Sequence, residues 1–358
     1  MNINEAYNSA VELLQKLIAI SSFSKEETAA ADFLQLFIES KGYTTIRKGN
    51  NIWSIAAGFD QSKKTLLLNS HIDTVRPTDA WTRNPFEAKI EGDKLYGLGS
   101  NDAGASLVSL LHVFFMLTEK EQPYNLIFSC SAEEEISGAN GCALMMQEMN
   151  LPINLAVVGE PTEMQLAVAE KGLLVLDCVS RGKSGHAARE EGENAIYKAI
   201  EDINWFRTFQ FEKQSELSGP VKMSVTMINA GTQHNVVPDH CEFVVDIRTN
   251  EFYSNQEVVD EVKKHVHCEV KPRSTHLNSS CISLEHSIVK RGLELGLTYY
   301  GSPTSSDQMR IPYTSIKIGP GKSSRSHTAD EFVYLSEIKE GIEIYLQLLD
   351  RLEIKNQL

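Results

Sequence analysis

TLLLNSHID, residues 65–73, joins a short apolar run to a histidine and an aspartate two residues apart. Three other apolar runs also end just before possible metal ligands; they are Asn125–Ser131, Leu155–Gly159 and Thr314–Ile318. Such nearly continuous runs, with helical segments between some of them, are typical of strands in a sheet that is covered on both faces. Because open α/β sheets bind ligands at the carboxyl ends of their strands, the sequence predicts one site built from all four runs.

Each run is followed by side chains that offer oxygen or imidazole nitrogen to a metal ion; they are His71 and Asp73, Glu133-Glu134-Glu135, Glu160, and His327 after a Gly-Pro-Gly loop. A fifth candidate, Asp102, follows the glycine-rich segment 96–101 and opens an apolar helix. Oxygen ligands with two histidines and no thiolate suit Zn²⁺, Co²⁺ or Mn²⁺ in a hydrolytic site. Two such ions, ~3.5–4 Å apart and sharing one carboxylate, are a common hydrolase arrangement.

Each of these motifs also has an ordinary structural explanation. The glutamate run can be a solvated acidic segment, Glu160 a turn residue before a proline, and Asp102 a helix cap. Three carboxylates at the end of a buried strand repel one another unless a cation neutralises them, which favours a metal site. A rival metal site would use the alternating His265, His267 and Glu269, but such alternation is normal for the solvated face of an edge strand.

The segment from about 173 to 283 has a different pattern from the rest of the chain. Its periodicity predicts, in order, strand 173–180, helix 194–209, strand 221–229, strand 241–248, helix 255–266 and strand 267–273. This β-α-β-β-α-β order is ferredoxin-like. The sequence therefore predicts an α/β protein in which residues 1–172 and 284–358 form a mixed central sheet flanked by helices. A ferredoxin-like α+β domain is inserted at residues 173–283.

Composition and charge exclude several function classes. The 358 residues are 42% hydrophobic, which suits two globular domains. A net charge of −14 argues against binding to nucleic acid or to an anionic membrane. The apolar helix Ala105–Leu117 is too short to span a bilayer. The six cysteines form no C-x-x-C pair and the N-terminus lacks signal-peptide features, so we expect a cytoplasmic protein with reduced thiols.

A known family shares the order of these motifs, which are H-x-D at 71–73, G-x-G-x-x-D at 97–102, a Glu pair, G-E-P at 159–161 and S-H-T at 326–328. The chain resembles the co-catalytic metallohydrolases, which include acetylornithine deacetylase, succinyl-diaminopimelate desuccinylase, aminoacylases and glutamate carboxypeptidase. The resemblance runs from about residue 65 to the end and covers the inserted segment. It implies a zinc-exopeptidase-like catalytic domain, two divalent metal ions, and a homodimer formed through the inserted domain.

The resemblance also implies a role for each matching position. The metal ligands would be Asp102 bridging both ions, His71 and Glu160 at one ion, and Glu135 and His327 at the other. The remaining roles would fall to Asp73 as hydrogen-bond partner of His71, Glu134 as general base, His186 as oxyanion ligand supplied by the partner subunit, and Asn235 and Arg248 as ligands of the substrate carboxylate. An arginine suits that last role because its fork matches a carboxylate.

The chain departs from the family pattern at two places. Relatives usually have Asp before the Glu pair, where this chain has Glu133. The base and ligand can therefore be Glu134 and Glu135 or Glu133 and Glu134, and we prefer the first pair because Gly138 then falls nearer its usual place. Relatives also have Met-Lys-Gly after the bridging aspartate, where this chain has Ala-Gly-Ala. The cis peptide that the family carries after that aspartate would fall at Asp102–Ala103.

The resemblance implies a reaction on a small molecule, the hydrolysis of an N-acyl-L-amino acid. Acetylornithine deacetylase is the member that the chain resembles most, so the expected substrate is N2-acetyl-L-ornithine, in arginine biosynthesis. Alternatives are N-acetyl- or N-succinyl-citrulline, succinyl-diaminopimelate, or a dipeptide. A metal-binding scaffold without activity is a third reading, against which the retained ligands and Glu134 argue. The sequence leaves open the acyl group, the amino acid and the metal.

Overall fold

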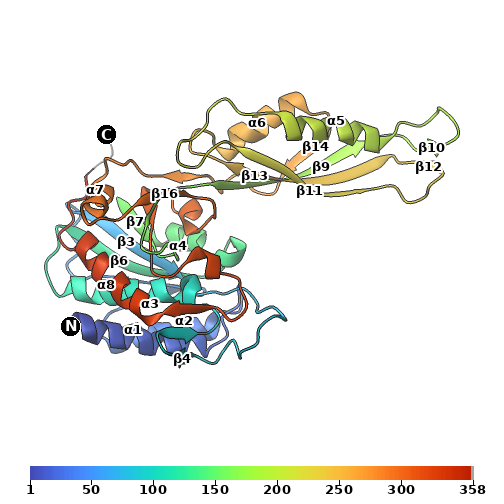
Figure 1. Ribbon diagram of the computed structural model, residues 1–358. Helices are drawn as coiled ribbons and strands as arrows, with labels where there is room; N and C mark the ends of the chain where they lie inside the picture. The colour runs from blue at the N-terminus through green and yellow to red at the C-terminus, as the bar shows by residue number, and fades with distance from the viewer. Residues whose placement is uncertain (356–358) are drawn as a thin grey trace. The chain divides into compact units, whose positions relative to one another are not determined.

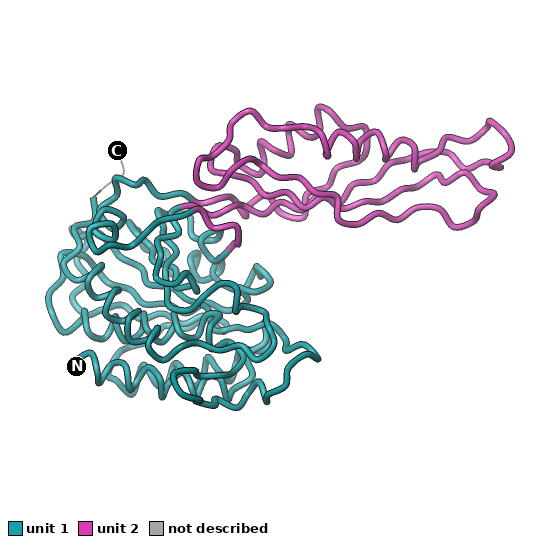
Figure 2. The backbone as a smooth tube through the Cα atoms, viewed as in Figure 1, with its two compact units in different colours: residues 1–168, 281–300, 306–358 teal, residues 169–280, 301–305 magenta. Residues whose placement is uncertain are grey.

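The computed structural model describes residues 1–355, which form two compact units (Figures 1 and 2). The larger unit takes residues 1–168, 281–300 and the chain from 306 onward. The smaller unit takes residues 169–280 and 301–305. Each unit has its own sheet and its own packed core, and each is described separately below.

The larger unit is built on a mixed sheet whose central strands are parallel. The strand order is β1-β2-β6-β3-β7-β17-β8-β15, with β16 paired to β8. The strands are β1 Ile46–Lys48, β2 Asn51–Ile55, β3 Lys64–His71, β6 Tyr124–Ser131, β7 Leu155–Val158, β8 Leu166–Glu170, β15 Ser280–Cys281, β16 Tyr299–Ser302 and β17 Ser315–Lys317. Strands β6, β3, β7 and β17 run parallel to one another, whereas β2 is antiparallel to β6. The four predicted runs are thus neighbouring strands.

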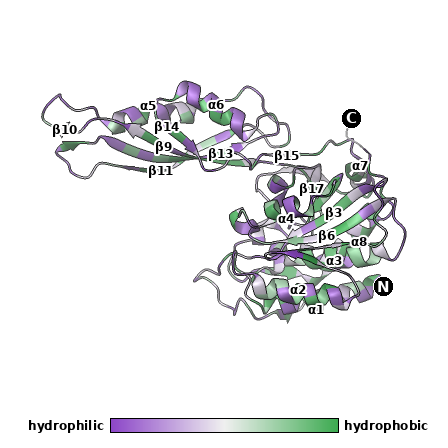
Figure 3. Cartoon of the chain, turned by 180° about the vertical axis from the view of Figure 1, so that it is seen from behind, coloured by the Kyte–Doolittle hydropathy of each residue, from purple (hydrophilic) through white to green (hydrophobic). Residues whose placement is uncertain are grey.

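Helices cover both faces of this sheet, as the apolar character of its strands predicts. The helices are α1 Ile3–Ile18, α2 Thr28–Ser40, α3 Ala105–Thr118, α4 Cys142–Met149, α7 Ser287–Glu294 and α8 Leu335–Leu349. Leu67 and Ile127 pack against α4 on one face, while α3 packs against β3 and β6 on the other. Figure 3 shows the hydrophobic residues that run along β3 and β6. The predicted mixed sheet flanked by helices is confirmed.

The most apolar helix of the chain is a core helix. Within the described residues, only the segment Ser100–Thr118 has the length and hydropathy that a membrane span requires, and 78% of its most apolar window is buried inside the protein. It combines an irregular turn, Ser100–Gly104, with α3, which contacts α1, α8 and the sheet. Its apolar side chains therefore face protein on nearly every side.

The smaller unit has the ferredoxin-like order. Its elements are β9 Gly172–Arg181, β10 Gly185–His186, α5 Ala195–Thr208, β11 Lys222–Ala230, β12 Val236–Val237, β13 His240–Thr249, α6 Asn255–His265 and β14 Glu269–Pro272. The antiparallel sheet has the order β11-β13-β9-β14, while β10 and β12 form a separate pair. Alternate residues such as Leu174, Leu176 and Phe243 are buried in a core with α5 and α6. The residues between these buried ones project from the opposite face of the sheet.

Two local patterns of the sequence mislead. Ser24 and Glu27 have the spacing of a capping box, but α2 begins at Thr28 and the Ser24 hydroxyl instead donates to Asp73 at 2.7 Å. His265 ends helix α6 and lies 3.0 Å from Glu261, so it does not share an extended strand with His267 and the rival metal site does not form. His265 pairs with Glu261 because residues four apart in a helix lie one turn from each other on the same face.

A separate three-stranded sheet completes the larger unit. Strand β18 (Phe332–Tyr334) pairs with β5 (Lys94–Tyr96), which pairs with β4 (Lys89–Glu91). The strands of this small sheet flank the site loops in the sequence. Strand β5 precedes the loop of Asp102, and β18 follows His327. The pairing of β5 with β18 therefore ties two of the predicted ligand segments together.

Candidate metal centre

The ends of the four parallel strands bring the predicted ligands together. His71 is the last residue of β3 and pairs with Ser131, the last residue of β6. Strand β7 ends at Val158, two residues before Glu160, and pairs with both β3 and β17. Since the carboxyl ends of parallel strands share one edge of a sheet, the loops that follow them meet there.

Asp102 lies between two histidines that come from distant parts of the chain. Its Oδ1 is 3.2 Å from Nε2 of His71, and its Oδ2 is 3.6 Å from Nε2 of His327. Glu160 Oε1 is 3.7 Å from Nε2 of His71, and Glu135 Oε2 is 2.8 Å from Nε2 of His327. The two oxygens of Asp102 therefore face two donor pairs, which is the arrangement that a bridging carboxylate requires.

The ligand atoms are close enough to hold a divalent cation. The structure forms two sets in which all ligand atoms lie within 4.8 Å of one another, namely His71 with Asp102 and Glu135, and His71 with Glu134 and Glu160. His71 is common to both sets. Glu134, expected as a base beside the metals, lies as close to His71 and Glu160 as a ligand does.

Asp73 orients both His71 and the glutamate loop. Nδ1 of His71 donates to the backbone carbonyl of Asp73 at 2.9 Å, so Nε2 is the nitrogen left for a metal. The carboxylate of Asp73 lies 3.5 Å from the same Nδ1 and accepts the backbone N–H groups of Glu134 at 3.0 Å and Glu135 at 3.1 Å. One carboxylate thus joins the end of β3 to the loop that follows β6.

The three adjacent glutamates point in different directions. Glu133 has a left-handed backbone with φ of 54°, and its buried carboxylate accepts the backbone N–H of Asn140 at 3.2 Å and the side-chain amide of Asn140 at 3.1 Å. Residues 138–141 fold over this carboxylate, and α4 begins after them, at Cys142. Glu134 and Glu135 are the two members of the run that face the histidines. This geometry favours the 134/135 pair over the 133/134 pair.

A buried glutamate that the sequence analysis missed holds the loop of Asp102. Glu331 is 2% exposed, and its carboxylate accepts three backbone N–H groups, from Gly99 at 2.9 Å, Asn101 at 2.8 Å and Asp102 at 2.9 Å. The expected cis peptide is present at Asp102–Ala103. Glu331 follows His327 by four residues, but no periodicity in that segment distinguishes a loop-binding glutamate from a solvated one.

Asp307 is a second buried carboxylate that the sequence analysis missed. It accepts hydrogen bonds from the Asn69 side chain at 3.0 Å and from the Ser131 hydroxyl, and burial raises its pKa to about 6. Asn69 and Ser131 belong to β3 and β6, just before the ligands. Asp307 lies in a short polar turn, Asp307–Arg310, outside every apolar run, so a search at strand ends does not reach it.

Burial and mutual repulsion disfavour the charged form of the carboxylates and so raise their pKa values. Burial raises the pKa of Glu134 well above its usual range, and Glu160 and Asp307 raise it further against the effect of His71. Burial likewise raises the pKa of Glu160 to about 8 and the pKa of Glu135. An acid whose anion is disfavoured in this way binds a proton or a cation, so the donor set fits divalent metal ions.

The pKa values of the two histidines and of Asp102 shift so that the charged form of each group is favoured. Burial lowers the pKa of His71, but hydrogen bonds to Asp102 and Asp73 outweigh it, and the net shift is well above the usual value. The hydrogen bond to Glu135 raises the pKa of His327 to about 9. Burial would raise the pKa of Asp102, yet its hydrogen bond with His71 brings it below the usual value.

The smaller unit places its three candidates at opposite ends. His186 in β10 pairs with Val236, and the Ala187 N–H donates to the Asn235 carbonyl at 3.0 Å, so His186 and Asn235 are neighbours. Arg248 lies near the far end of β13, opposite Leu173. Figure 1 shows β10 and β12 at one end of this unit. The stretch of β13 from His240 to Arg248 alone spans about 26 Å.

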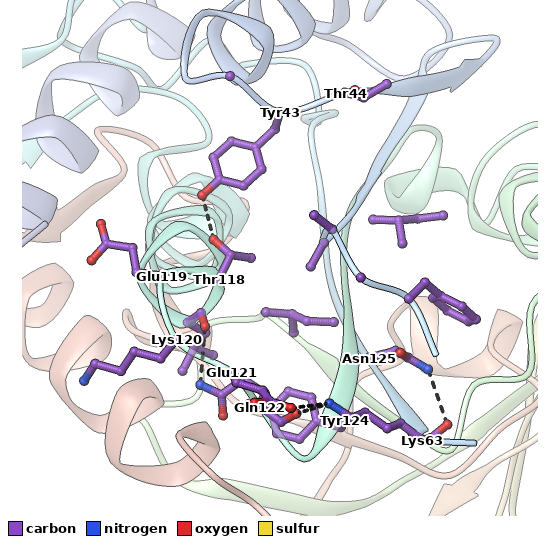
Figure 4. Close-up of a pocket in the computed structure, with 18 residues that line it drawn as sticks. Tyr43, Thr44, Lys63, Thr118, Glu119, Lys120, Glu121, Gln122, Tyr124 and Asn125 are labelled. Carbon is purple, nitrogen blue, oxygen red and sulfur yellow. Dashed lines mark hydrogen bonds and ion pairs between the residues drawn. The ribbon is translucent and has the colours of Figure 1, made fainter. Parts of the chain in front are cut away.

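A separate pocket of about 690 Å³ lies at the amino ends of β3 and β6 (Figure 4). Its lining includes Tyr43, Lys63 and Tyr124, and the predicted site residues, all within the described part of the chain, do not line it. Its polar groups are engaged, because Tyr43 Oη lies 2.6 Å from the Thr118 hydroxyl and Lys63 Nζ donates to the Gln122 carbonyl at 3.0 Å. This pocket therefore offers no candidate chemistry.

Comparisons with known proteins agree with this fold. The family model described as peptidase family M20/M25/M40 matches residues 67–351. A LysW-lysine/LysW-ornithine hydrolase of Sulfurisphaera tokodaii is 28% identical over 362 residues, which cover 97% of this chain and 96% of that protein. The crystal structure of aminopeptidase PepT from Bacillus cereus has a TM-score of 0.76 at 19% identity and covers 98% of both chains. The YXEP protein of Bacillus subtilis, described as a dinuclear metal binding peptidase from the M20 family, has a TM-score of 0.72 at 15% identity, over 97% of this chain and 98% of that one.

Proposed function

The chain belongs to peptidase family M20/M25/M40 and is a hydrolase of that family, and we propose that it removes the N-acyl group from an N-acyl-L-amino acid, with N2-acetyl-L-ornithine as the reference substrate. One observation carries the proposal, the placement of both oxygens of Asp102 between His71 and His327. The similarity to a protein named as a LysW-ornithine hydrolase supports an ornithine-like amino acid.

We assign two metal ions to the strand ends. Asp102 would be shared by both ions, His71 and Glu160 would hold one ion, and Glu135 and His327 would hold the other. The Bacillus subtilis neighbour is described as a dinuclear metal binding peptidase, which supports two ions rather than one. Zn²⁺ is the first choice for this set of nitrogen and oxygen donors, with Co²⁺ or Mn²⁺ as alternatives. Bound there, the ions would polarise the scissile carbonyl and lower the pKa of water toward ~7.

Glu134 is the group that moves the proton. It lies as close to His71 and Glu160 as a ligand does, so it can take a proton from water held there and return it to the leaving amine. Its backbone N–H is held by Asp73, the same residue that fixes the tautomer of His71. The general base and one metal ligand are therefore positioned by one residue, Asp73, through its carboxylate and its backbone carbonyl.

Arg248 is proposed to bind the α-carboxylate, and the structure suggests how it is oriented. Asp246, two residues earlier on the same strand, accepts from Nε at 2.9 Å and from Nη2 at 3.1 Å, while Nη1 lies 3.4 Å from the Ser305 hydroxyl. A guanidinium has five N–H donors, so these three contacts leave two. Two donors at the end of the fork suit one carboxylate.

We propose that the active form is a homodimer. His186 and Asn235 lie beyond one end of the smaller sheet and Arg248 lies at the other, whereas an N-acylated amino acid is only about 10 Å long. A second copy of the chain would therefore supply His186 and Asn235 to the site of the first. The edge strand β11 exposes Met227 and Ile228, at 64% and 56%, and an apolar edge of this kind suits pairing with another copy.

The test is a substrate panel with the full chain loaded with Zn²⁺ or Co²⁺. We expect release of free amine from N-acetyl- or N-succinyl-L-ornithine, with citrulline and diaminopimelate derivatives and unblocked dipeptides as comparisons. Turnover of dipeptides alone would replace the proposal with a peptidase function. Tight metal binding with no turnover of any amide would refute the enzymatic proposal.

A further inference from the structure

A short turn of the larger unit, Asp307–Arg310, contacts both strands that lead into the metal centre, and we call it the clamp turn. Oδ2 of Asp307 accepts the side-chain amide of Asn69 at 3.0 Å and also accepts the hydroxyl of Ser131. Asn69 lies on β3 two residues before His71, and Ser131 pairs with His71 at the end of β6. One carboxylate oxygen therefore joins β3 to β6 at the level where both strands end.

A second hydrogen bond orients the amide of Asn69 toward the clamp turn. The hydroxyl of Ser129, which pairs with Asn69 in the parallel register, donates to Asn69 Oδ1 at 2.7 Å. The amide nitrogen must then face Asp307. All the side chains of this network are buried. The ends of β3 and β6 are therefore held together by side chains as well as by the backbone ladder.

The other end of the clamp turn holds the glutamate loop. Nη2 of Arg310 donates to the backbone carbonyl of Ser137, two residues after Glu135. Ser137 has a left-handed backbone with φ of 48°, and its N–H donates to the Glu134 carbonyl at 2.7 Å. A residue other than glycine keeps this conformation only where its surroundings hold it. Arg310 thus fixes the end of the loop that carries Glu134 and Glu135.

The clamp turn places polar groups where the fold alone would not favour them. Asp307 is buried, its two side-chain donors are uncharged, and burial raises its pKa to about 6. Among residues 1–355, the buried Nε of Arg310 has no hydrogen-bond acceptor. Burying a carboxylate without a cation, or a donor without an acceptor, is unfavourable. Exceptions of this kind are expected where the groups serve a functional site.

We propose that Asp307 and Arg310 are positioning residues, which hold the strand end of His71 and the loop of Glu134 in the relation that proton transfer needs. This inference rests on the proposed function, in which Glu134 is the general base and His71 is a metal ligand. Asp307 acts through β3 and β6, since its hydrogen bonds end on those strands. A displacement of about 1 Å between reacting groups can cost about 10²-fold in rate. The clamp turn therefore acts on the chemical step rather than on substrate binding.

The experiment separates position from charge, because both hydrogen bonds of Asp307 fall on one oxygen. In D307N the amide oxygen can replace Oδ2 and keep both bonds, whereas D307A loses both. With Zn²⁺-loaded full chain and N2-acetyl-L-ornithine, we expect D307A and R310M to lower kcat at least about tenfold, with KM within about threefold of wild type. D307N should keep kcat within about threefold of wild type. S131A, which removes one of the two donors, takes the place of D307A if that variant does not fold.

The matched control is R291M. Arg291 of α7 also donates to backbone carbonyls, those of Leu348 at 3.2 Å and Asp350 at 2.8 Å. A purely structural arginine moves the unfolding temperature and leaves the rate per folded, metal-loaded molecule unchanged. We therefore expect R291M to unfold at a lower temperature than wild type and to keep the wild-type kcat.

The outcomes separate this inference from the proposed function. Wild-type kcat in folded D307A and R310M, or a loss in D307N equal to that in D307A, overturns the clamp turn while leaving a deacylase. If wild type hydrolyses no N-acyl amino acid, the proposed function fails and competition for Zn²⁺ with a chelator decides the clamp turn. Zn²⁺ binding at least about tenfold weaker in D307A and R310M, but kept in D307N and R291M, then supports it. Equal Zn²⁺ affinity in all four variants overturns it.

Discussion

Replacing Glu331 with glutamine tests whether the loop of Asp102 is held in place for metal binding. The carboxylate accepts three backbone N–H groups, two on Oε1 from Asn101 and Asp102 and one on Oε2 from Gly99. In E331Q an amide N–H₂ must replace one of these oxygens. If it replaces Oε2, it faces the N–H of Gly99, and that buried donor loses its acceptor.

The magnitude follows from that count. One buried donor without an acceptor costs about 1–3 kcal/mol, and the other orientation of the amide would orphan two donors instead of one. The loop carries the proposed bridging ligand, and groups that support a ligand typically change metal affinity by about 10–100-fold. We therefore expect E331Q to be destabilised by about 1–3 kcal/mol and to bind Zn²⁺ at least about tenfold more weakly than wild type.

The assay is competition for Zn²⁺ with a chromophoric chelator, at a temperature where thermal unfolding curves show both proteins folded. E343Q, in helix α8, is the control for loss of one negative charge near the C-terminus. Zn²⁺ affinity within about twofold of wild type in a folded E331Q would refute the reasoning, because this difference is smaller than one hydrogen bond supplies.

The glutamate run, the buried acids and the shared site each give a further test. E134Q should lower kcat by at least about 10²-fold with metal still bound, because proton transfer is worth ~10²–10⁴. E133Q should lower the unfolding temperature and leave kcat of the folded protein nearly unchanged. The opposite result would make Glu133 the base and Glu134 the ligand. Burial raises the pKa of Glu160 to about 8 from 4.5. In metal-free protein the contribution of Glu160 to stability is therefore complete below pH 4.5 and is lost as pH rises to 8. The melting temperature should fall by about 4 °C or more between pH 5 and 8, and Zn²⁺ should reverse the trend. An equal mixture of H186A and R248A should regain about a quarter of wild-type activity after subunit exchange. About half of the dimers are then mixed, and each mixed dimer holds one complete site out of two if two copies share each site. No recovery after subunit exchange contradicts the proposed dimer.

Regular patterns in the sequence predict the parts of this fold that depend on one strand or helix at a time. The apolar run before His71 becomes β3, and the alternation in 173–180 becomes β9, because burial of one or both faces fixes the period of the side chains. The loop before α4 is different, since Glu133 holds residues 138–140 around its carboxylate. That contact depends on the direction of one side chain, which no periodicity encodes.

The same distinction applies to the site. Ligands such as His71 and Glu160 are found from the sequence because they follow strands, and strand ends share an edge. Glu331 and Asp307 are equally buried, but they sit in turns whose positions are set by the sheets they contact rather than by their own segments. The sequence order also cannot reveal that His186 and Arg248 lie at opposite ends of one sheet, since that follows from the strand pairing.

The number of buried acids explains why the strand ends need cations to be stable as well as active. Glu134, Glu160 and Glu331 each have a pKa raised mainly by burial, so at neutral pH the fold must keep protons on carboxyl groups or hold charge that nothing compensates. Two divalent ions held by the proposed ligands would bring four positive charges close to these acids. The free energy of metal binding would therefore be partly free energy of folding, because the ions would relieve a repulsion that the folded chain alone creates. A scaffold selected only for stability has no reason to gather these carboxylates, whereas a hydrolase needs a base and metal ligands around one water molecule and further acids that hold those ligands in place.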